Sequence, residues 1–166
     1  MANVVVGITG GIAAYKAVEV IRQLVELGHT VKALPTANAL KFVGKPTLEA
    51  ISHNPVDTDL FADVAEVKHV ALAAWADLIV VAPATASFLA RTRAGLVDDL
   101  LGNTISATTA PTLIAPAMHT AMWQNAATQE NVQVLRTRAI QVMTPATGRL
   151  TGGDTGIGRL PEPDAI

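Results

Sequence analysis

Short apolar runs alternate with longer segments of helical periodicity along the chain of 166 residues. Runs of this kind, rich in Val, Ile, Leu and Ala, are typical of strands buried on both faces of a parallel sheet. They predict strands at 4–8, 30–34, 78–81, 112–115 and 140–143. Helical spacing predicts helices at 12–27, 68–76, 87–107 with a break near Gly95, and 128–138, with two short helical pieces around Pro46 between 40 and 52. The alternation predicts an α/β fold, a doubly wound parallel sheet with helices on both faces.

The segment 145–163 breaks this pattern. It contains five closely spaced glycines, which are expected to prevent a regular helix or strand. They are Gly148, Gly152, Gly153, Gly156 and Gly158. A long irregular segment in a compact domain is usually a functional lid or a disordered end. We therefore predict a single domain, 1–166, that carries a Gly-rich lid near its C-terminal end.

Composition narrows the class of protein. Charged residues make up only 16% of the chain, where a soluble domain typically has about 25%, so we expect other subunits to cover part of the surface. A net charge of −2 argues against nucleic acid or an acidic membrane as partner.

The absence of cysteine excludes disulfides, thiolate metal sites and a cysteine nucleophile, and no spacing of His, Asp and Glu resembles a metal site. No targeting signal or membrane span is visible, so we expect a cytoplasmic protein.

Four loops follow predicted strands and should share one crevice, because ligands of open parallel sheets bind beyond the carboxyl ends of the strands. These loops are 9–11, 35–36, 83–87 and 116–119. Gly10 and Gly11 precede a helix, whose N-terminal N–H groups suit a phosphate. Neither GxGxxG nor GxxxxGK[ST] is present, and Pro35-Thr36 offers no acid for a dinucleotide ribose, so a mononucleotide fits better. A plain turn that needs glycine only for its geometry is the alternative.

Two histidines lie near this crevice. His69 opens a predicted helix and could serve as a general base, although a surface or capping histidine is commoner. His119 follows a strand end and should face the crevice. Met118, Met122 and Trp123 have the helical spacing of ordinary packing residues, and Asp98-Asp99 has the pattern of a solvated helix face.

Five segments together resemble one family, the flavin-dependent cysteine decarboxylases, which bind FMN on a flavodoxin-like sheet. The segments are Thr9–Lys16, His69-Val70 followed by Trp75–Leu78, Ala82–Ala86, Pro116–Trp123 and Gly153–Arg159. Pro116–Trp123 resembles the family's Pro-X-Met-Asn-X-X-Met-Trp signature, and Gly153–Arg159 resembles its substrate lid. The closest likeness is to the branch that decarboxylates 4′-phosphopantothenoylcysteine (PPC) to 4′-phosphopantetheine in coenzyme A biosynthesis. In that branch the domain is often fused to a phosphopantothenate–cysteine ligase, so we expect this chain to be truncated before such a domain.

The resemblance implies roles for individual residues. FMN contacts are expected from Gly10, Gly11, Ile12, Ala13, Thr36, Pro83, Ala84, Thr85, Ala86 and Ser87. Substrate contacts are expected from Met118, His119, Met122, Gly153, Asp154 and Arg159, and His69 matches the catalytic base. The implied reaction oxidises the substrate thiol to a thioaldehyde, releases carbon dioxide to give an enethiol, and then reduces the enethiol with a hydride and a proton. The resemblance also implies a homo-oligomer, a trimer that could stack into a dodecamer, with flavin at subunit contacts.

Two residues depart from the family pattern. His119 stands in place of the signature asparagine, and Gly152 in place of the lid cysteine that supplies the final proton. His119 is the expected replacement donor, with Asp154 or water as alternatives.

Other functions stay open. One is a peptidyl-cysteine decarboxylase of the lantibiotic type, whose lid also lacks the cysteine. Another is a non-catalytic flavin-binding regulatory subunit, against which the presence of His69 argues. The signature and lid segments argue against a flavin prenyltransferase.

Overall fold

The computed structural model describes residues 1–60 and 67–166. Five parallel strands form one sheet in the order β2-β1-β3-β4-β5. Their bounds are β1 Asn3–Ile8, β2 Thr30–Pro35, β3 Leu78–Ala84, β4 Thr112–Pro116 and β5 Gln141–Val142. This order is that of flavodoxin-like folds, in which the topological switch point lies between β1 and β3. The predicted doubly wound α/β fold is confirmed.

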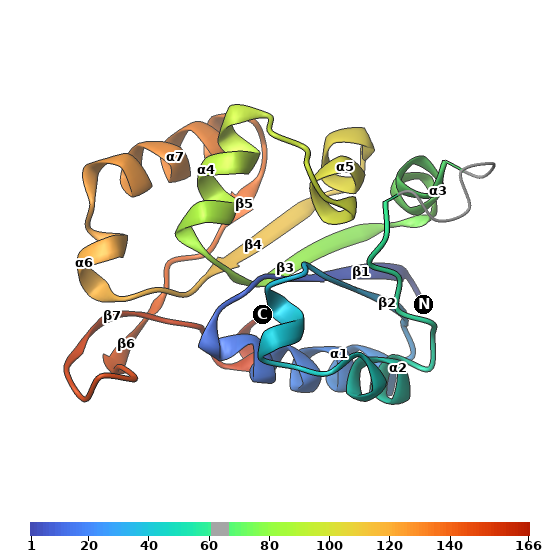
Figure 1. Ribbon diagram of the computed structural model, residues 1–166, viewed down its shortest axis with the longest axis horizontal. Coiled ribbons are helices and arrows are strands. Elements are labelled where there is room, and N and C mark those ends of the chain that lie inside the picture. Colours follow the sequence, from blue (N-terminus) through green and yellow to red (C-terminus); the bar gives the residue numbers. More distant parts are fainter. Residues whose placement is uncertain (61–66) are drawn as a thin grey trace.

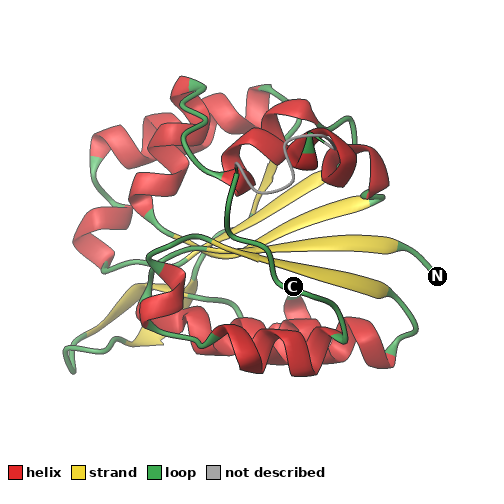
Figure 2. Ribbon diagram, turned by 45° about the vertical axis from the view of Figure 1, so that its right-hand side comes forward, coloured by secondary structure: helices red, strands yellow, loops and turns green. Residues whose placement is uncertain are grey.

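Helices cover both faces of the sheet (Figures 1 and 2). Below it in Figure 1 lie α1 (Ala17–Glu26) and α2 (Lys45–Ser52), and above it lie α3 (Lys68–Trp75), α4 (Ala86–Ala94), α5 (Leu100–Ala107) and α7 (Ala126–Thr137). Shorter helices are η1 (Ile12–Lys16), η2 (Ala39–Lys41), α6 (Thr120–Trp123) and η4 (Pro163–Ala165). Val4 and Val6 pack into the core with α1, whereas Val5 packs into the core with α5 and α7. Burial on both faces explains why the strands appear as continuous apolar runs.

The glycine-rich tail contradicts the prediction of an irregular segment. Ala146–Arg149 (β6) and Thr155–Arg159 (β7) pair antiparallel as a hairpin that projects from the body of the domain (Figure 2). Its glycines allow close packing. A Cβ on Gly148 would lie 2.7 Å from the Arg159 guanidinium, and one on Gly156 would lie 2.2 Å from the Thr120 hydroxyl. Contacts that are distant in sequence, and not turn geometry, therefore account for these glycines.

Other boundaries also differ from the prediction. The segment 12–27 starts as a 3-10 helix before it becomes α1, and β3 continues through Pro83 after a cis Ala82–Pro83 peptide. The predicted break at Gly95 is confirmed, since Gly95 ends α4 with a positive φ of 73°.

Asp98 and Asp99 are not in mid-helix as expected. Asp99 caps α5 by accepting a hydrogen bond from the Gly102 N–H, and both carboxylates pair with Arg91. Burial lowers the pKa of the Arg91 guanidinium, but hydrogen bonds to Asp99 and Asp98 outweigh it and raise that pKa overall. The acidic pair is therefore a structural cap and ion-pair cluster.

Candidate functional site

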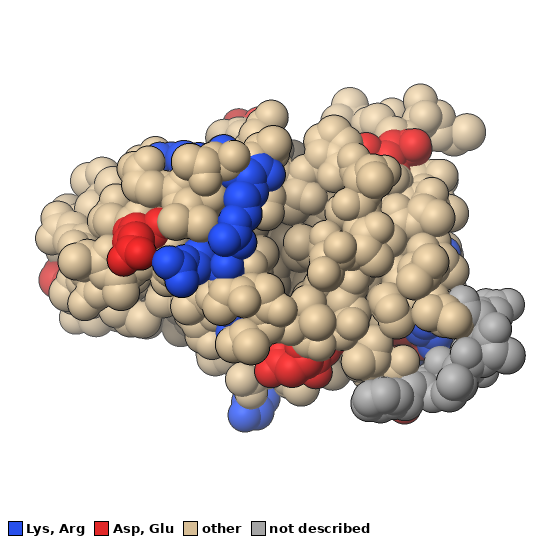
Figure 3. Space-filling model, turned by 90° about the horizontal axis from the view of Figure 1, so that it is seen from above, with Lys and Arg blue, Asp and Glu red and all other residues tan. Residues whose placement is uncertain are grey.

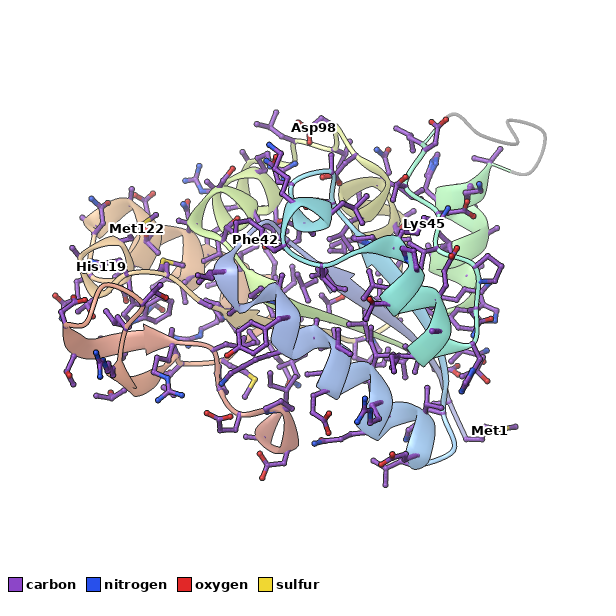
Figure 4. All side chains as sticks on the ribbon, turned by 60° about the horizontal axis from the view of Figure 1, so that its bottom comes forward. Met1, Phe42, Lys45, Asp98, His119 and Met122 are labelled. Atoms are coloured by element: carbon purple, nitrogen blue, oxygen red, sulfur yellow. The ribbon has the colours of Figure 1, made fainter. Side chains whose placement is uncertain are left out.

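A pocket of about 730 Å³ opens at the carboxyl ends of the strands, within the usual range of roughly 300–1,000 Å³ for small-molecule sites. Four parts of the chain form it: η1, the start of α4, the β4–α6 connection and the β6–β7 hairpin. Figure 4 shows His119 and Met122 together at this end of the molecule, beside the hairpin and far from Met1 and Lys45. The predicted crevice beyond the strand ends is therefore present.

The turn after β1 contains two glycines with different environments. A Cβ on Gly10 would lie 2.4 Å from the Cβ of Asn38, so packing against the loop after β2 requires that glycine. A Cβ on Gly11 would meet its nearest atoms, in Thr85 and Pro83, at 3.7 and 3.9 Å, which is ordinary contact. Gly11 lines the pocket, and the missing side chain leaves room there for a ligand.

Thr9 joins this turn to the loop after β3. Its hydroxyl donates to the Pro83 carbonyl oxygen at 2.7 Å and accepts from the Thr85 N–H at 3.0 Å, and its side chain is 2% exposed. Thr85 in turn caps α4 by accepting from the Phe88 N–H. The residues Ile12 and Ala13 of the first turn of η1 line the same side of the pocket. Because the first turn of a helix leaves its N–H groups without intrahelical partners, this wall can bind a phosphate group.

The hairpin packs against the end of β4. The Met118 N–H donates to the Gly158 carbonyl at 2.9 Å, and a Cβ on Gly158 would lie 2.0 Å from the Met118 carbonyl oxygen. Gly158 also has φ +148°, a conformation that side-chain-bearing residues rarely adopt. Only glycine fits here, and it brings the hairpin over Met118 and His119.

His119 contacts the tip of the hairpin. Its Nδ1 accepts a hydrogen bond from the Ala121 N–H at 3.1 Å, and its Nε2 lies 2.8 Å from the Asp154 carboxylate. Because a backbone N–H only donates, Nδ1 carries no proton and the ring proton lies on Nε2. The two candidate proton donors of the sequence analysis are thus in direct contact, with side chains 53% and 48% exposed.

Three permanent cations line the pocket: Lys16, Arg149 and Arg159. Lys16 and Arg159 share the carboxylate of Glu162, each at 3.1 Å. Arg149 forms no ion pair with any of the described residues. The lining therefore carries more positive charge than its neighbouring carboxylate neutralises, which suits anionic ligands.

The structure brings together about half of the predicted site residues. Those that line the pocket are Gly11, Ile12, Ala13, Thr85, Ala86, Met118, His119, Met122 and Arg159. Those placed beside it or behind its wall are Gly10, Thr36, Pro83, Ala84, Ser87, Gly153 and Asp154. Thr36 is buried and its N–H donates to the Ile8 carbonyl, so it lies next to the end of β1.

His69 is not part of this pocket. It lies in the first turn of α3, which packs against α5 at the opposite side of Figure 1 from α6 and the hairpin. Within one chain, therefore, the expected base and the expected substrate wall are separated.

Several lining residues received no individual binding role from the sequence, although all lie in the segments that carry the resemblance or in the predicted lid 145–163. They are Tyr15, Lys16, Ala117, Arg149, Leu150, Thr151, Gly152 as a lining residue, Gly158 and Leu160. Lys16 and Tyr15 lie one helical turn beyond the predicted loop, and Arg149 lies in the predicted lid. A search for cations near the loop and within the lid would have found Lys16 and Arg149.

Much of the surface is uncharged. Figure 3 shows one face with a run of Lys and Arg, a few separate basic groups and a few acidic groups on an otherwise neutral surface. Apolar side chains are exposed at the pocket rim, with Ile12 at 56% and Tyr15 at 61%, and beside His69, with Val70 at 49%. Among the described residues, no helix is long and apolar enough to cross a membrane.

Comparison with known proteins places the chain among flavoproteins. The model of the family described as flavoprotein matches residues 1–166. The coenzyme A biosynthesis bifunctional protein CoaBC of Mycolicibacterium smegmatis is 57% identical over 164 residues, which cover 99% of this chain and 40% of that protein. The chain spans about two fifths of the length of the curated relatives it matches.

Two solved structures have closely similar folds. A PPC decarboxylase mutant in complex with pantothenoylaminoethenethiol has a TM-score of 0.89 and 31% identity, covering 99% of this chain and 93% of the other. The FMN-dependent cysteine decarboxylase SpaF has a TM-score of 0.85 and 32% identity, covering 95% and 90%.

Proposed function

The chain belongs to the flavoprotein family, and on that premise we propose that it binds FMN and decarboxylates PPC to 4′-phosphopantetheine in coenzyme A biosynthesis. One observation carries the proposal: a pocket with a phosphate-suited turn on one wall and a cationic hairpin on the other. The similar PPC decarboxylase and the similar bifunctional proteins support the choice of substrate. The ligand of that decarboxylase is named as an ethenethiol, the type of compound that the implied decarboxylation would leave.

The turn after β1 and the start of α4 would hold FMN. Gly11 leaves room for the cofactor between Thr85 and Pro83, and the N–H groups at Ile12 and Ala13 suit its phosphate. When bound, FMN would accept a hydride in the oxidation of the substrate thiol and return it in the final reduction. The chain's own residues bind the substrate beside it, exclude water and hold protons.

The hairpin and the β4–α6 connection would hold the reacting end of the substrate. Met118, His119 and Met122 line the wall to which the substrate carboxylate is assigned, and Gly152 lines the same pocket. Because Gly152 cannot donate a proton, we assign that role to His119. Asp154, whose carboxylate lies 2.8 Å from Nε2, orients the imidazole ring.

His69 would act as the base from a second copy of the chain. Exposed apolar side chains lie both at the pocket rim and beside His69, as a head-to-tail contact between copies would require. Such heterologous contacts close into rings, and a trimer is the ring that we propose, with further stacking into a dodecamer. The largely uncharged surface supports this assembly.

The bifunctional relatives support two further parts of the proposal. The natural protein would carry a fused phosphopantothenate–cysteine ligase that supplies the substrate, and the reaction would take place in the cytoplasm.

The test is to incubate the flavin-loaded protein with PPC under anaerobic conditions and to determine the mass of the product. We expect loss of one carbon dioxide, with the flavin oxidised at the end of each turnover. A flavin-loaded protein that leaves PPC unchanged would contradict the proposal.

The same assay with a peptide ending in cysteine tests the second candidate function, a peptidyl-cysteine decarboxylase. The glycine at position 152 favours this candidate.

A further inference from the structure

Arg149 is the one cation of the pocket lining without a carboxylate partner among the described residues. It is the last residue of β6, its side chain is exposed, and its guanidinium lies 4.0 Å from where a Cβ on Gly153 would be. Within the described part of the chain, the Arg149 side chain makes no hydrogen bond and no ion pair. A guanidinium that lines a pocket and lacks a partner is available to bind an anion of the ligand.

The two arginines of the pocket lining lie at different positions along the hairpin. Arg159 and Lys16 lie at the base of the hairpin, where Glu162 joins them. Ala146 pairs with Arg159 at that base, and Arg149 lies three residues further along β6, roughly 10 Å away at about 3.3 Å per residue. The backbone of Arg149 therefore lies nearer the tip of the hairpin than that of Arg159, whose side chain reaches along the hairpin to Gly148.

The proposed substrate has two anionic groups, a carboxylate and a phosphate, and the chemistry distinguishes them as partners. The carboxylate leaves as neutral carbon dioxide, so a strong ion pair to it would stabilise the ground state more than the transition state and would slow the reaction. The phosphate keeps its charge throughout. An arginine bound to the phosphate stabilises both states equally and improves binding without slowing the chemical step.

We propose that Arg149 binds the phosphate of the substrate and so selects the phosphorylated compound over its dephosphorylated form. This inference rests on the proposed function and adds to it a specificity-determining residue. The planar guanidinium can bind two phosphate oxygens at once, which the ammonium of a lysine cannot reproduce.

The experiment compares the flavin-loaded wild type with Arg149→Gln. For PPC we expect KM to rise about 10- to 100-fold with kcat nearly unchanged, the scale of lost charge-assisted hydrogen bonds. For pantothenoylcysteine, which lacks the phosphate, we expect no change. Arg149→Lys should recover part of the loss. Arg22→Gln is the matched control, because Arg22 lies on α1, outside the pocket lining, and its ion-pair partner is Glu19 on the same helix.

Two results would overturn the inference: an equal loss with pantothenoylcysteine, which would assign Arg149 to the carboxylate, or no loss with PPC. Retention of flavin absorbance by Arg149→Gln separates a substrate effect from a cofactor effect.

Binding of 4′-phosphopantetheine and of pantetheine by calorimetry makes the test independent of turnover. We expect Arg149→Gln to weaken only the phosphorylated ligand. If the wild type turns over neither substrate but shows this difference, the proposed function fails and the assignment of Arg149 stands. If turnover is normal and the difference is absent, only the assignment of Arg149 fails.

Discussion

The pocket has a proposed cofactor wall, formed by Gly11–Ala13 and the start of α4, and a proposed substrate wall, formed by Met118–Met122 and the β6–β7 hairpin, and the two are built in different ways. The cofactor wall is fixed by buried hydrogen bonds, since the Thr9 hydroxyl bonds both to the Pro83 carbonyl and to the Thr85 N–H. The substrate wall is a projecting hairpin attached by the Met118–Gly158 backbone bond and by exposed pairs such as His119–Asp154. Exposed ion pairs contribute only about 0–1 kcal/mol each. The fold therefore sets the cofactor wall in advance, whereas ligand contacts can rearrange the substrate wall at small cost.

The largest effect is expected from a residue that belongs to neither wall. His69→Asn should lower decarboxylation by about 10²- to 10⁴-fold, the scale for loss of a general acid or base, while flavin and assembly are retained. Steady-state turnover and the flavin spectrum measure the two properties. Mixing this variant with a pocket variant such as Met118→Trp should restore activity if neighbouring copies share sites. Wild-type turnover by His69→Asn alone would refute the role.

Substitutions at the two glycines should sharpen the description of the cofactor wall. Gly11→Leu places a side chain in the pocket, and we expect FMN affinity to fall about 10- to 100-fold, which corresponds to an overpacking cost of about 1–3 kcal/mol. Flavin retention during gel filtration and titration of the apoprotein measure this. Gly44→Leu, at an exposed helix cap with ordinary contacts, is the control. Unchanged FMN affinity in Gly11→Leu would remove Gly11 from the site.

Gly10→Ala should behave differently, because its Cβ would collide with Asn38. We expect a loss of about 1–3 kcal/mol in the free energy of unfolding of the apoprotein, measured by urea denaturation. Gly11→Ala should leave that free energy almost unchanged. Equal stability of the two variants would contradict the distinction between a structural and a ligand-contacting glycine.

On the substrate wall, His119→Ala should change the product more than the rate. We expect carbon dioxide release to fall less than 10-fold, because proton donation follows decarboxylation. The product should shift to the unreduced enethiol, two hydrogens lighter, with an external oxidant needed for further turnover. His119→Asn keeps a side chain able to cap α6 and serves as the control for the lost cap. Complete reduction by both variants would exclude His119 as the donor.

The smallest effect is expected at the base of the hairpin. Glu162→Gln removes the charge shared by Lys16 and Arg159, in pairs whose side chains are 58% exposed at Glu162, 38% at Arg159 and 17% at Lys16. We expect the free energy of unfolding to change by less than about 1 kcal/mol, measured by the urea midpoint. A loss several times larger would show that the substrate wall is as firmly fixed as the cofactor wall.

The sheet could be predicted from sequence because its signal is local. The runs around Val5, Val80 and Ile114 are continuous and apolar, and burial on both faces of a parallel sheet produces that pattern wherever the strands lie. The crevice followed from the strand ends alone. The end of a helix at Gly95 could likewise be predicted from the local sequence, because the signal is the glycine itself.

The hairpin could not be predicted because its glycines respond to distant residues. Gly156 is required by Thr120 and Gly158 by Met118, and neither neighbour is visible in the local pattern. The charge of Arg149 within the predicted lid was visible in the sequence, but a segment expected to be irregular gave no direction to its side chain. His69 was found by resemblance, but its separation from the pocket is visible only in the structure.

The Thr120 hydroxyl, packed beneath Gly156, is buried without a hydrogen-bond partner among the described residues. Such a group forfeits about 1–3 kcal/mol relative to one that reaches water. The folded protein carries this penalty because the hairpin packs on α6. Thr120→Val, which removes the hydroxyl and keeps the shape, should therefore raise the free energy of unfolding by an amount of about that size, measured by urea denaturation.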